Sequence, residues 1–266
     1  MRKADFDKIK KYGKRTVLET VRDTDGGKNV CYHIVQYSLP VFHSSDTLAI
    51  EFDNNGSYIY SAVYTDPHRH IQPVYQLSQR MTDAYFHGRG LKNALVLGCA
   101  GCTIPRFLAL HYKDCETVGV EYSKQFVEIA RRFFFNEQMK KRFELINADA
   151  FAYLDENCGK KRFGLIYTDI YVGDIIHPKV YTDSFTQQVY DMLEDGGFAV
   201  INSFRVPLEK IKGFAQSIKA PFGAVYVIEQ YRKHYIALAK TSDSGILGTF
   251  ERKLPKYAVI DMKKVK

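Results

Sequence analysis

The sequence predicts an α/β protein in which a small β-rich N-terminal domain precedes a doubly wound, mostly parallel sheet. Two observations support this fold class. Beyond residue 90, short apolar runs of four or five residues alternate with helical segments, as in a parallel sheet covered by helices on both faces. Before residue 70, turn residues alone separate the apolar runs, which is typical of antiparallel hairpins.

The first 70 residues contain two strand-like runs and a hairpin. Residues 31–37 and 47–52 are rich in β-branched and aromatic residues. The Asp-Asn-Asn-Gly cluster at 53–56 is a strong turn signal, and residues 57–60 follow it as the return strand. We therefore expect residues 1–70 to form a separate N-terminal domain.

Alternating strands and helices then define a larger domain over residues 71–240. Each strand is a short apolar run, and the helix that follows it carries the chain back across the sheet. The expected strands are 94–97, 117–120, 143–146, 165–168 and 198–202, the expected helices are 71–87, 104–112, 125–135 and 185–193, and residues 222–239 form a closing hairpin. Residues 241–266 are expected to be a peripheral tail.

The composition is that of an ordinary globular protein. Of 266 residues, 45% are hydrophobic and 26% are charged, and no apolar run approaches the roughly 20 residues that cross a bilayer. The first ten residues alternate in charge and lack the apolar stretch of a signal peptide. Five scattered cysteines indicate reduced thiols rather than a disulfide framework. We therefore expect a cytoplasmic protein with no membrane partner.

The charge pattern and the potential metal ligands are less informative. The formal net charge of +8 lies partly in basic clusters at residues 8–11, 140–142 and 263–266, but no nucleic-acid-binding motif accompanies them. Solvated helix faces and a tail explain these clusters better, so nucleic acid is not an expected partner. Cys99 and Cys102 form a C-x-x-C without the second pair that a zinc site needs, so we expect small buried loop residues and no metal.

Small residues follow the first strand of the parallel unit. Gly98, Cys99, Ala100 and Gly101 form a loop that lets a ligand approach the backbone. The helix that follows offers free N–H groups at its N-terminus. For this loop alone, a tight turn without any ligand is the alternative.

Acidic residues follow the next three strands. Glu121 comes directly after the second strand and can accept two hydrogen bonds from a ribose diol. Asp149, followed by Ala150, comes after the third strand, where its carboxylate can accept from an adenine amino group or cap a helix. Asp169 comes after the fourth strand, where the reacting end of a bound nucleoside should lie. The order of these residues at successive strand ends favours nucleoside binding.

Four segments resemble the motifs of the spermidine synthase-like proteins. The matching segments are residues 95–108, 118–123, 147–150 and 166–169. The first is similar to the family's glycine-rich loop, which is followed by an apolar, Pro/Leu and Arg stretch. Upstream, residues 52–56 and the Tyr75-Gln76 pair resemble the family's hairpin and its Tyr-His/Gln pair.

The resemblance implies a Rossmann-like fold of the class I methyltransferase type and a transferase that moves an aminopropyl group to an amine. The cofactor would be S-adenosylmethionine or its decarboxylated form, with methylthioadenosine or S-adenosylhomocysteine as product. The residues that would hold it are Gly98, Cys99, Ala100, Gly101, Glu121, Asp149 and Ala150. Asp169 would be the catalytic base that deprotonates the attacking amine. The residues that would contact the substrate are Tyr75, Gln76, Tyr171 and Asp174.

One departure separates this sequence from the polyamine enzymes of the family. Those enzymes carry a second acid three residues after the base, where this chain has Val172, and Asp174 stands two residues further on. The expected partner is a small-molecule acceptor, an amine, and the oligomeric state stays open, with a homodimer as one possibility. Methyl transfer to a non-polyamine substrate and a nucleoside-binding module without catalysis remain as alternatives.

Overall fold

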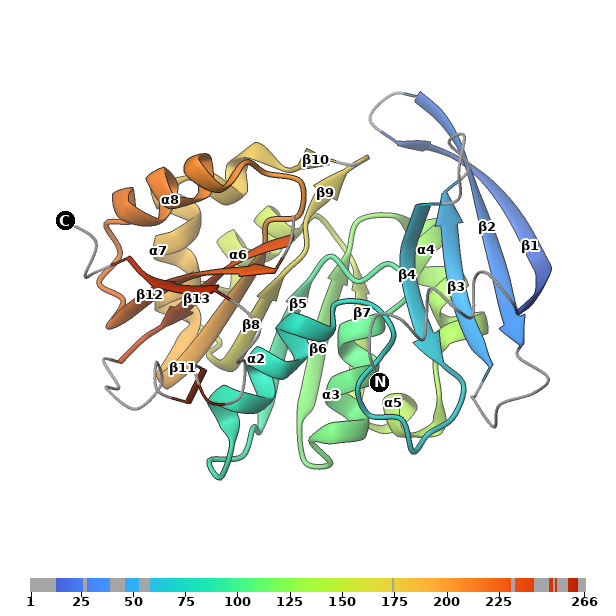
Figure 1. Ribbon diagram of the computed structural model, residues 1–266, viewed down its shortest axis with the longest axis horizontal. Helices are drawn as coiled ribbons and strands as arrows, with labels where there is room; N and C mark the ends of the chain where they lie inside the picture. The colour runs from blue at the N-terminus through green and yellow to red at the C-terminus, as the bar shows by residue number, and fades with distance from the viewer. Residues whose placement is uncertain are drawn as a thin grey trace.

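The structure is a computed structural model that describes residues 13–25, 28–38, 46–52, 58–173, 175–230, 233–241, 249–250, 252 and 258–262. These residues form two main sheets, an antiparallel sheet of four strands and a mixed sheet of eight. In Figure 1 the N-terminal sheet, in blue, stands at one side of the larger sheet.

The N-terminal sheet has the strand order β1-β2-β3-β4, and each neighbouring pair is antiparallel. Its strands are β1 (Lys14–Asp25), β2 (Lys28–Ser38), β3 (Thr47–Phe52) and β4 (Tyr58–Tyr64). The last three confirm the predicted strands, while the predicted turn at 53–56 lies outside the described residues. The sequence pattern does not predict β1, because a register shift between Val17 and Glu19 interrupts the alternation of apolar and polar residues.

The larger sheet has the strand order β14-β12-β13-β11-β8-β5-β6-β7. Its strands are β5 (Asn93–Leu97), β6 (Glu116–Glu121), β7 (Phe143–Asn147), β8 (Phe163–Thr168), β11 (Leu193–Asn202), β12 (Ala224–Gln230), β13 (Lys233–Ala239) and β14 (Ala258–Asp261). The five neighbouring strands β11, β8, β5, β6 and β7 are parallel, and β13 runs antiparallel to β11. The chain leaves β5 toward β6 and β7 and then returns to β8 on the other side. The switch point, where ligands bind beyond the carboxyl ends of strands, therefore lies between β5 and β8.

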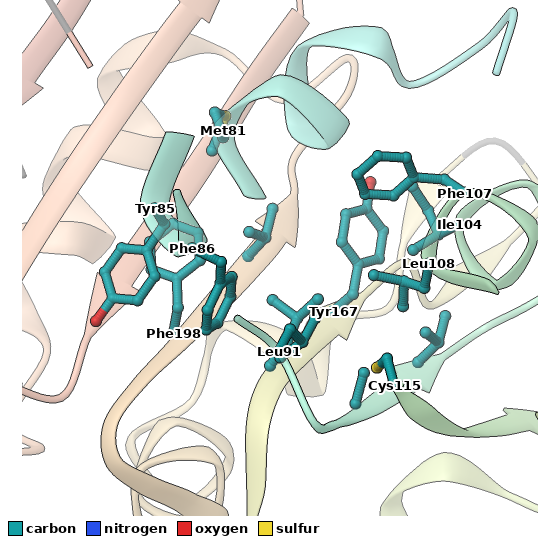
Figure 2. Packing of buried hydrophobic residues seen from close by; sticks show 14 of the residues in the cluster. Met81, Tyr85, Phe86, Leu91, Ile104, Phe107, Leu108, Cys115, Tyr167 and Phe198 are labelled. Atoms are coloured by element: carbon teal, nitrogen blue, oxygen red, sulfur yellow. The ribbon is translucent and has the colours of Figure 1, made fainter. Parts of the chain in front are cut away.

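Helices cover both faces of this sheet, which confirms the doubly wound α/β fold class. One face packs against α2 (Gln76–Phe86), α3 (Thr103–His111), α4 (Lys124–Ile129) and α5 (Glu137–Arg142), and the other against α6 (Ala150–Asn157), α7 (Asp183–Met192) and α8 (Leu208–Ser217). A π-helix, η1 (Ala130–Phe134), continues α4. Figure 2 shows the core on the first face, where Tyr85 stacks on Phe198 with ring centroids 4.2 Å apart.

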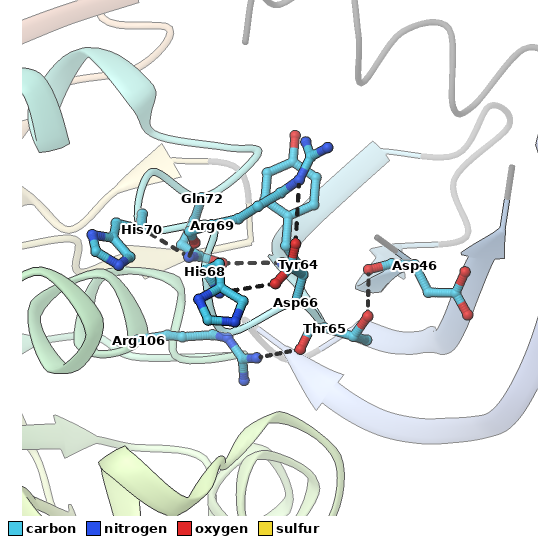
Figure 3. Close-up of polar contacts among 9 residues, drawn as sticks. All are labelled: Asp46, Tyr64, Thr65, Asp66, His68, Arg69, His70, Gln72 and Arg106. Atoms are coloured by element: carbon cyan, nitrogen blue, oxygen red, sulfur yellow. Dashed lines mark hydrogen bonds and ion pairs between the residues drawn. The ribbon is translucent and has the colours of Figure 1, made fainter. Parts of the chain in front are cut away.

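Two predicted boundaries are wrong. The helix expected at 71–87 begins only at Gln76, because the residues before it form a loop that is tied together by the side chain of Gln72. This side chain accepts a hydrogen bond from the Tyr64 N–H at 3.0 Å and donates to the carbonyl of Arg69 at 2.6 Å (Figure 3). The tail beyond residue 240 is not peripheral throughout, since Phe250 is fully buried and β14 pairs with β12.

Three further features concern the described part of the chain. No helix there is long and apolar enough to cross a membrane. No group of three or more His, Cys, Asp or Glu side chains there is arranged to hold a metal ion. All five cysteines are free thiols.

Candidate nucleoside site and catalytic base

The loop after β5 begins with a close backbone contact to the loop after β8. Gly98 has a φ of 83°, and a Cβ at this position would lie 2.2 Å from the carbonyl oxygen of Asp169. The Asp169 N–H donates in turn to the carbonyl of Leu97 at 2.8 Å. Glycine is therefore required at residue 98 both by its φ and by the approach of a second backbone segment.

The rest of this loop is held by Glu121, the last residue of β6. Its Oε2 accepts hydrogen bonds from the N–H groups of Cys99 and Ala100 at 3.0 and 2.8 Å, and its Oε1 accepts from the Ser123 N–H at 2.9 Å. Burial raises the pKa of Glu121, and these N–H donors oppose the increase. Ala100 has a φ of 41°, a strained value for a residue with a Cβ, and the carboxylate stabilises that conformation. Glu121 thus holds the conformation of the loop with which it is predicted to bind the cofactor.

The loop also packs against the N-terminal sheet. A Cβ on Gly101 would lie 2.8 Å from the Oγ of Ser61 on β4. The same Ser61 Oγ lies 2.7 Å from the Oγ1 of Thr103, and Thr103 donates to the carbonyl of Ala62 at 3.0 Å. Sequence reasoning attributes Gly101 to the approach of a ligand, and the structure supplies a packing reason for it.

Cys99 and Cys102 are both buried. Burial raises the pKa of each thiol well above its ordinary value, so neither is a ready nucleophile. A Cβ on Gly119 of β6 would lie 2.7 Å from the Cys99 Sγ, which shows how tightly the thiol is packed. The pair has the small, buried character that the sequence predicts.

The third strand end carries Asp149 as the N-cap of α6. Its Oδ1 accepts hydrogen bonds from the N–H groups of Phe151 and Ala152 at 2.7 and 3.0 Å, and Ala150 is the first helical residue. The helix-cap alternative is therefore realised. The Asp149 side chain is exposed at the same time, so capping with one oxygen leaves the carboxylate accessible to a ligand.

An exposed aromatic residue that sequence reasoning missed comes directly after Glu121. Tyr122 follows Glu121 and is 78% exposed. Asn147 ties its backbone to β7, because the Asn147 Nδ2 donates to the carbonyls of Glu121 and Tyr122 at 3.0 and 2.8 Å. An aromatic ring that is exposed beside two acids at strand ends offers a stacking surface for a planar ligand.

Asp169 follows β8 and is partly buried. The Asn202 Nδ2, at the end of β11, donates to the Asp169 Oδ1 at 2.7 Å. Burial raises the pKa of Asp169 to about 6, hydrogen bonds from Asn202 and Tyr75 oppose the increase, and the nearby carboxylate of Glu121 adds to it. A carboxyl group with a pKa near neutrality can accept and release a proton under ordinary conditions.

Tyr75 reaches Asp169 from the loop that precedes α2. Its hydroxyl hydrogen-bonds the Asp169 carboxylate and lies 2.9 Å from the carbonyl oxygen of Tyr60 on β4. Tyr75 has a φ of 57°, which is uncommon for a bulky residue and places a strained backbone beside the candidate base. The structure therefore brings Tyr75 and Asp169 together, although 93 residues separate them in the sequence.

Arg106 fixes the connection from which Tyr75 emerges. The residue is 5% exposed, and its guanidinium donates to the carbonyls of Phe134 and Thr65 at 3.0 and 3.3 Å, the second of which is drawn in Figure 3. Burial lowers the pKa of Arg106 to about 10. Arg106 thus links α3, η1 and the segment after β4 around the site. His68 and His70 on the same segment are exposed, and the His70 ring packs edge-on against His111 with ring centroids 5.8 Å apart.

Two other predicted substrate residues, Tyr171 and Gln76, lie in the hairpin after Asp169 and at the point where the loop before α2 joins the helix. Tyr171 begins a short hairpin, β9 (Tyr171–Val172) and β10 (Ile175–Ile176), and its hydroxyl donates to the carbonyl of Asn202 at 3.2 Å. Burial is the largest cause that raises the pKa of Tyr171. The Gln76 amide donates to the carbonyl of Pro73 at 3.3 Å, within its own loop. Asp174 lies outside the described residues.

The hairpin reaches across to the N-terminal sheet. The Tyr60 hydroxyl donates to the carbonyl of Gly173 at 3.4 Å. Val172 and Ile175 pair across the hairpin and are 42% and 67% exposed. The position three residues after Asp169 is therefore an exposed apolar residue in a short strand.

Comparisons with known proteins identify solved structures that are similar to this one. No protein-family model matches the sequence, and no curated protein matches it. A probable spermidine synthase from Corynebacterium glutamicum superimposes with a TM-score of 0.69 at 16% identity, over 91% of each chain. A spermidine synthase in complex with the transition-state analogue AdoDATO gives 0.52 at 16% identity, over 91% of this chain and 86% of that one.

A methyltransferase also shares the fold. Human methyltransferase-like protein 13 in complex with SAH superimposes with a TM-score of 0.54 at 20% identity, over 71% of this chain and 93% of that one. The chain has the fold of the spermidine synthases and class I methyltransferases.

Proposed function

We propose that this chain is a transferase that binds S-adenosylmethionine or its decarboxylated form and transfers an aminopropyl group to a small amine, with Asp169 as the base. The observation that carries the proposal is the state of Asp169. It lies beside the topological switch point, it is held by Asn202 and Tyr75, and burial raises its pKa to about 6. A carboxylate with these properties is suited to proton transfer rather than to a structural ion pair.

The residues at the carboxyl ends of β5, β6 and β7 fit an adenosyl group. Both carboxylate oxygens of Glu121 already accept from backbone N–H groups of the loop, so a ribose diol would share acceptor positions with these donors. Asp149 is exposed and can accept from an adenine amino group, and Tyr122 offers its ring face. When bound, a sulfonium compound of this type supplies an electrophilic carbon.

The remaining chemistry belongs to the chain's own residues. An ammonium group has no lone pair, so the acceptor must lose a proton before it attacks. Asp169 takes that proton on its carboxylate, and Tyr75 and Asn202 hold the carboxylate in position. The neighbouring Gly98 backbone keeps the cofactor loop in contact with the base, which fixes the distance between the two halves of the reaction.

The acceptor should carry one amine rather than two separated cations. Val172 occupies the position of the second acid in the polyamine enzymes that this sequence resembles, and Ile175 faces it across the hairpin. An apolar hairpin favours an acceptor with an apolar body over a dication such as putrescine, because a second ammonium would lose hydration without gaining a partner.

Methyl transfer is the second candidate. It is supported by the likeness to human methyltransferase-like protein 13, which was solved in complex with SAH. The same adenosyl pocket would serve, and the loss of the second acid is compatible with a substrate that is not a polyamine. The difference between the two candidates lies in whether the bound cofactor is decarboxylated.

Calorimetric titration with S-adenosylmethionine, decarboxylated S-adenosylmethionine and methylthioadenosine tests the proposal. Preference for the decarboxylated compound and methylthioadenosine supports aminopropyl transfer, and preference for S-adenosylmethionine supports methyl transfer. Mass spectrometry of a panel of monoamines and diamines, incubated with the preferred compound, then identifies the transferred group. Failure to bind any of the three would contradict the proposal in both forms.

A further inference from the structure

The environment of Asn202 goes beyond a single hydrogen bond. Asn202 is the last residue of β11, directly beside β8, and the residue is only 3% exposed. Its backbone is fixed on two sides, because it pairs with Tyr235 of β13 and its carbonyl accepts from the Tyr171 hydroxyl. The amide is therefore presented to Asp169 by a rigid part of the sheet.

The nitrogen and the oxygen of the Asn202 side-chain amide differ in their hydrogen bonding. The Nδ2 donates to the Asp169 Oδ1 at 2.7 Å, whereas the Oδ1 of Asn202 is buried without a hydrogen-bond partner among the described residues. A buried acceptor without a partner costs free energy, so its presence beside a candidate base calls for a reason. An amide carries a donor and an acceptor on one carbon, and a half-turn of the terminal torsion exchanges them.

This arrangement matches the two states of a carboxyl group. Ionised Asp169 is an acceptor only and takes the hydrogen bond from the Asn202 Nδ2. Protonated Asp169 has an O–H to donate, and after the half-turn the Asn202 Oδ1 can accept it. A hydrophobic side chain of the same size could do neither.

We propose that Asn202 is a positioning residue that holds the Asp169 carboxyl in both protonation states, before and after it takes the proton of the acceptor. The inference rests on the proposed function, because it assigns Asp169 the role of base. During transfer the proton moves from the acceptor nitrogen to the Asp169 carboxylate, and Asn202 exchanges one hydrogen bond for another without gaining or losing a proton.

The other groups that face Asp169 define the background for a test. A hydrogen bond with the side chain of Tyr75, in the loop before α2, lowers the pKa of Asp169, and the carboxylate of Glu121 on β6 raises it. Tyr167 on β8, Tyr171 on β9 and Cys99 in the loop after β5 interact with Asp169, and each has a raised pKa, so all three are neutral where Asp169 titrates. Changes at Asn202 therefore report on one contact.

The test is a direct titration of the Asp169 carboxyl by carbon-13 NMR in the full chain, with Asp169→Asn to identify its signal. Asn202→Leu removes the amide and keeps the branching at Cγ. The hydrogen bond to the ionised carboxylate is stronger than the one to the neutral acid, so we expect this variant to raise the pKa of Asp169 by about one unit. Asn202→Asp places a second carboxyl at the same distance and should raise it further, because two adjacent carboxylates cannot both ionise easily. Ser203→Ala is the control, since Ser203 is the adjacent buried residue.

The same variants should move the acidic limb of the pH profile of kcat/KM. The base must be ionised, so activity is lost below its pKa, and a raised pKa moves this limb to higher pH. Ser203→Ala should leave the limb in place. An unchanged Asp169 titration in Asn202→Asp, or in Asn202→Leu with parental circular dichroism, would overturn the inference. If the titrations shift as expected but the parent transfers nothing to any amine, the proposed function fails while the contact stands.

Discussion

The backbone of Gly98 meets the backbone of Asp169 so closely that a Cβ on residue 98 would lie 2.2 Å from the Asp169 carbonyl oxygen. This contact joins the loop after β5, which carries the predicted cofactor residues, to the loop after β8, which carries the candidate base. A substitution that moves the backbone of one loop should therefore displace the other loop as well.

Gly98→Ala tests this coupling. The substitution forces a Cβ into a backbone carbonyl at a φ of 83°, so something must shift. Gly159→Ala is the matched control, because Gly159 has a similar φ of 77° and nothing within 4 Å of its Cβ position. We expect the control to lose about 1–2 kcal/mol in the free energy of unfolding from φ alone. Gly98→Ala should lose more, together with adenosyl affinity. Equal losses measured by urea denaturation would contradict the coupling.

Glu121→Gln should weaken binding of the preferred adenosyl compound by about 1.5–3 kcal/mol, the range for a hydrogen bond to a charged group. The amide would turn donor hydrogens toward N–H groups of the loop, so the loop should loosen as well. Glu144→Gln, at an exposed position on β7, is the control. Calorimetric titration measures the affinity of each variant for the adenosyl compound. Parental affinity in Glu121→Gln would remove Glu121 from the binding site.

Tyr75→Phe removes the hydroxyl that hydrogen-bonds Asp169. This hydrogen bond favours the ionised carboxyl, so its loss should raise the pKa of Asp169 above about 6. The acidic limb of kcat/KM should then move to higher pH, because the base must be ionised to act. Tyr85→Phe removes a hydroxyl that donates to the carbonyl of Gly196, away from the site, and should leave the profile unchanged. A profile that moves equally in both variants would argue for a general structural effect.

Val172→Asp should improve putrescine as an acceptor. It supplies a second carboxylate three residues after Asp169, and we expect kcat/KM for putrescine to rise by about tenfold or more, the equivalent of one favourable ionic hydrogen bond. Leu18→Asp adds the same charge at a residue of β1 with similar exposure, 41% against 42%. If both variants respond alike, net charge explains the gain and the proposed acceptor position is wrong.

The strands of the parallel sheet were predictable because their signals are local. The apolar runs of β5, β6, β7, β8 and β11 each end in a polar or small residue, and alternation of strands and helices implies a parallel sheet. β14 and the burial of Phe250 were not predictable, because a single aromatic residue and a short strand gain their places only by packing against β12 and the core.

In the candidate site, too, the residues with local sequence signals were predictable and the contacts that depend on tertiary packing were not. Asp169, Glu121 and Asp149 stand at strand ends and could be found by position alone. The contact between Asp169 and Asn202 depends on β11 lying beside β8, and the contact with Tyr75 depends on the seating of the loop before α2. One signal for Asn202 was present, since it closes the fifth predicted strand. Roles of individual residues in binding and catalysis stay predictions.

The most direct test of the account is the turnover of Asp169→Asn, measured by mass spectrometry on the best acceptor of the amine panel. A general base contributes roughly 10²–10⁴-fold in rate, so turnover should fall by about that factor. Affinity for the adenosyl compound should stay within about threefold of the parent, since the substitution removes proton transfer and leaves the contacts of Glu121 and Asp149 in place. Near-parental turnover by Asp169→Asn would contradict the role of Asp169 and, with it, the central claim.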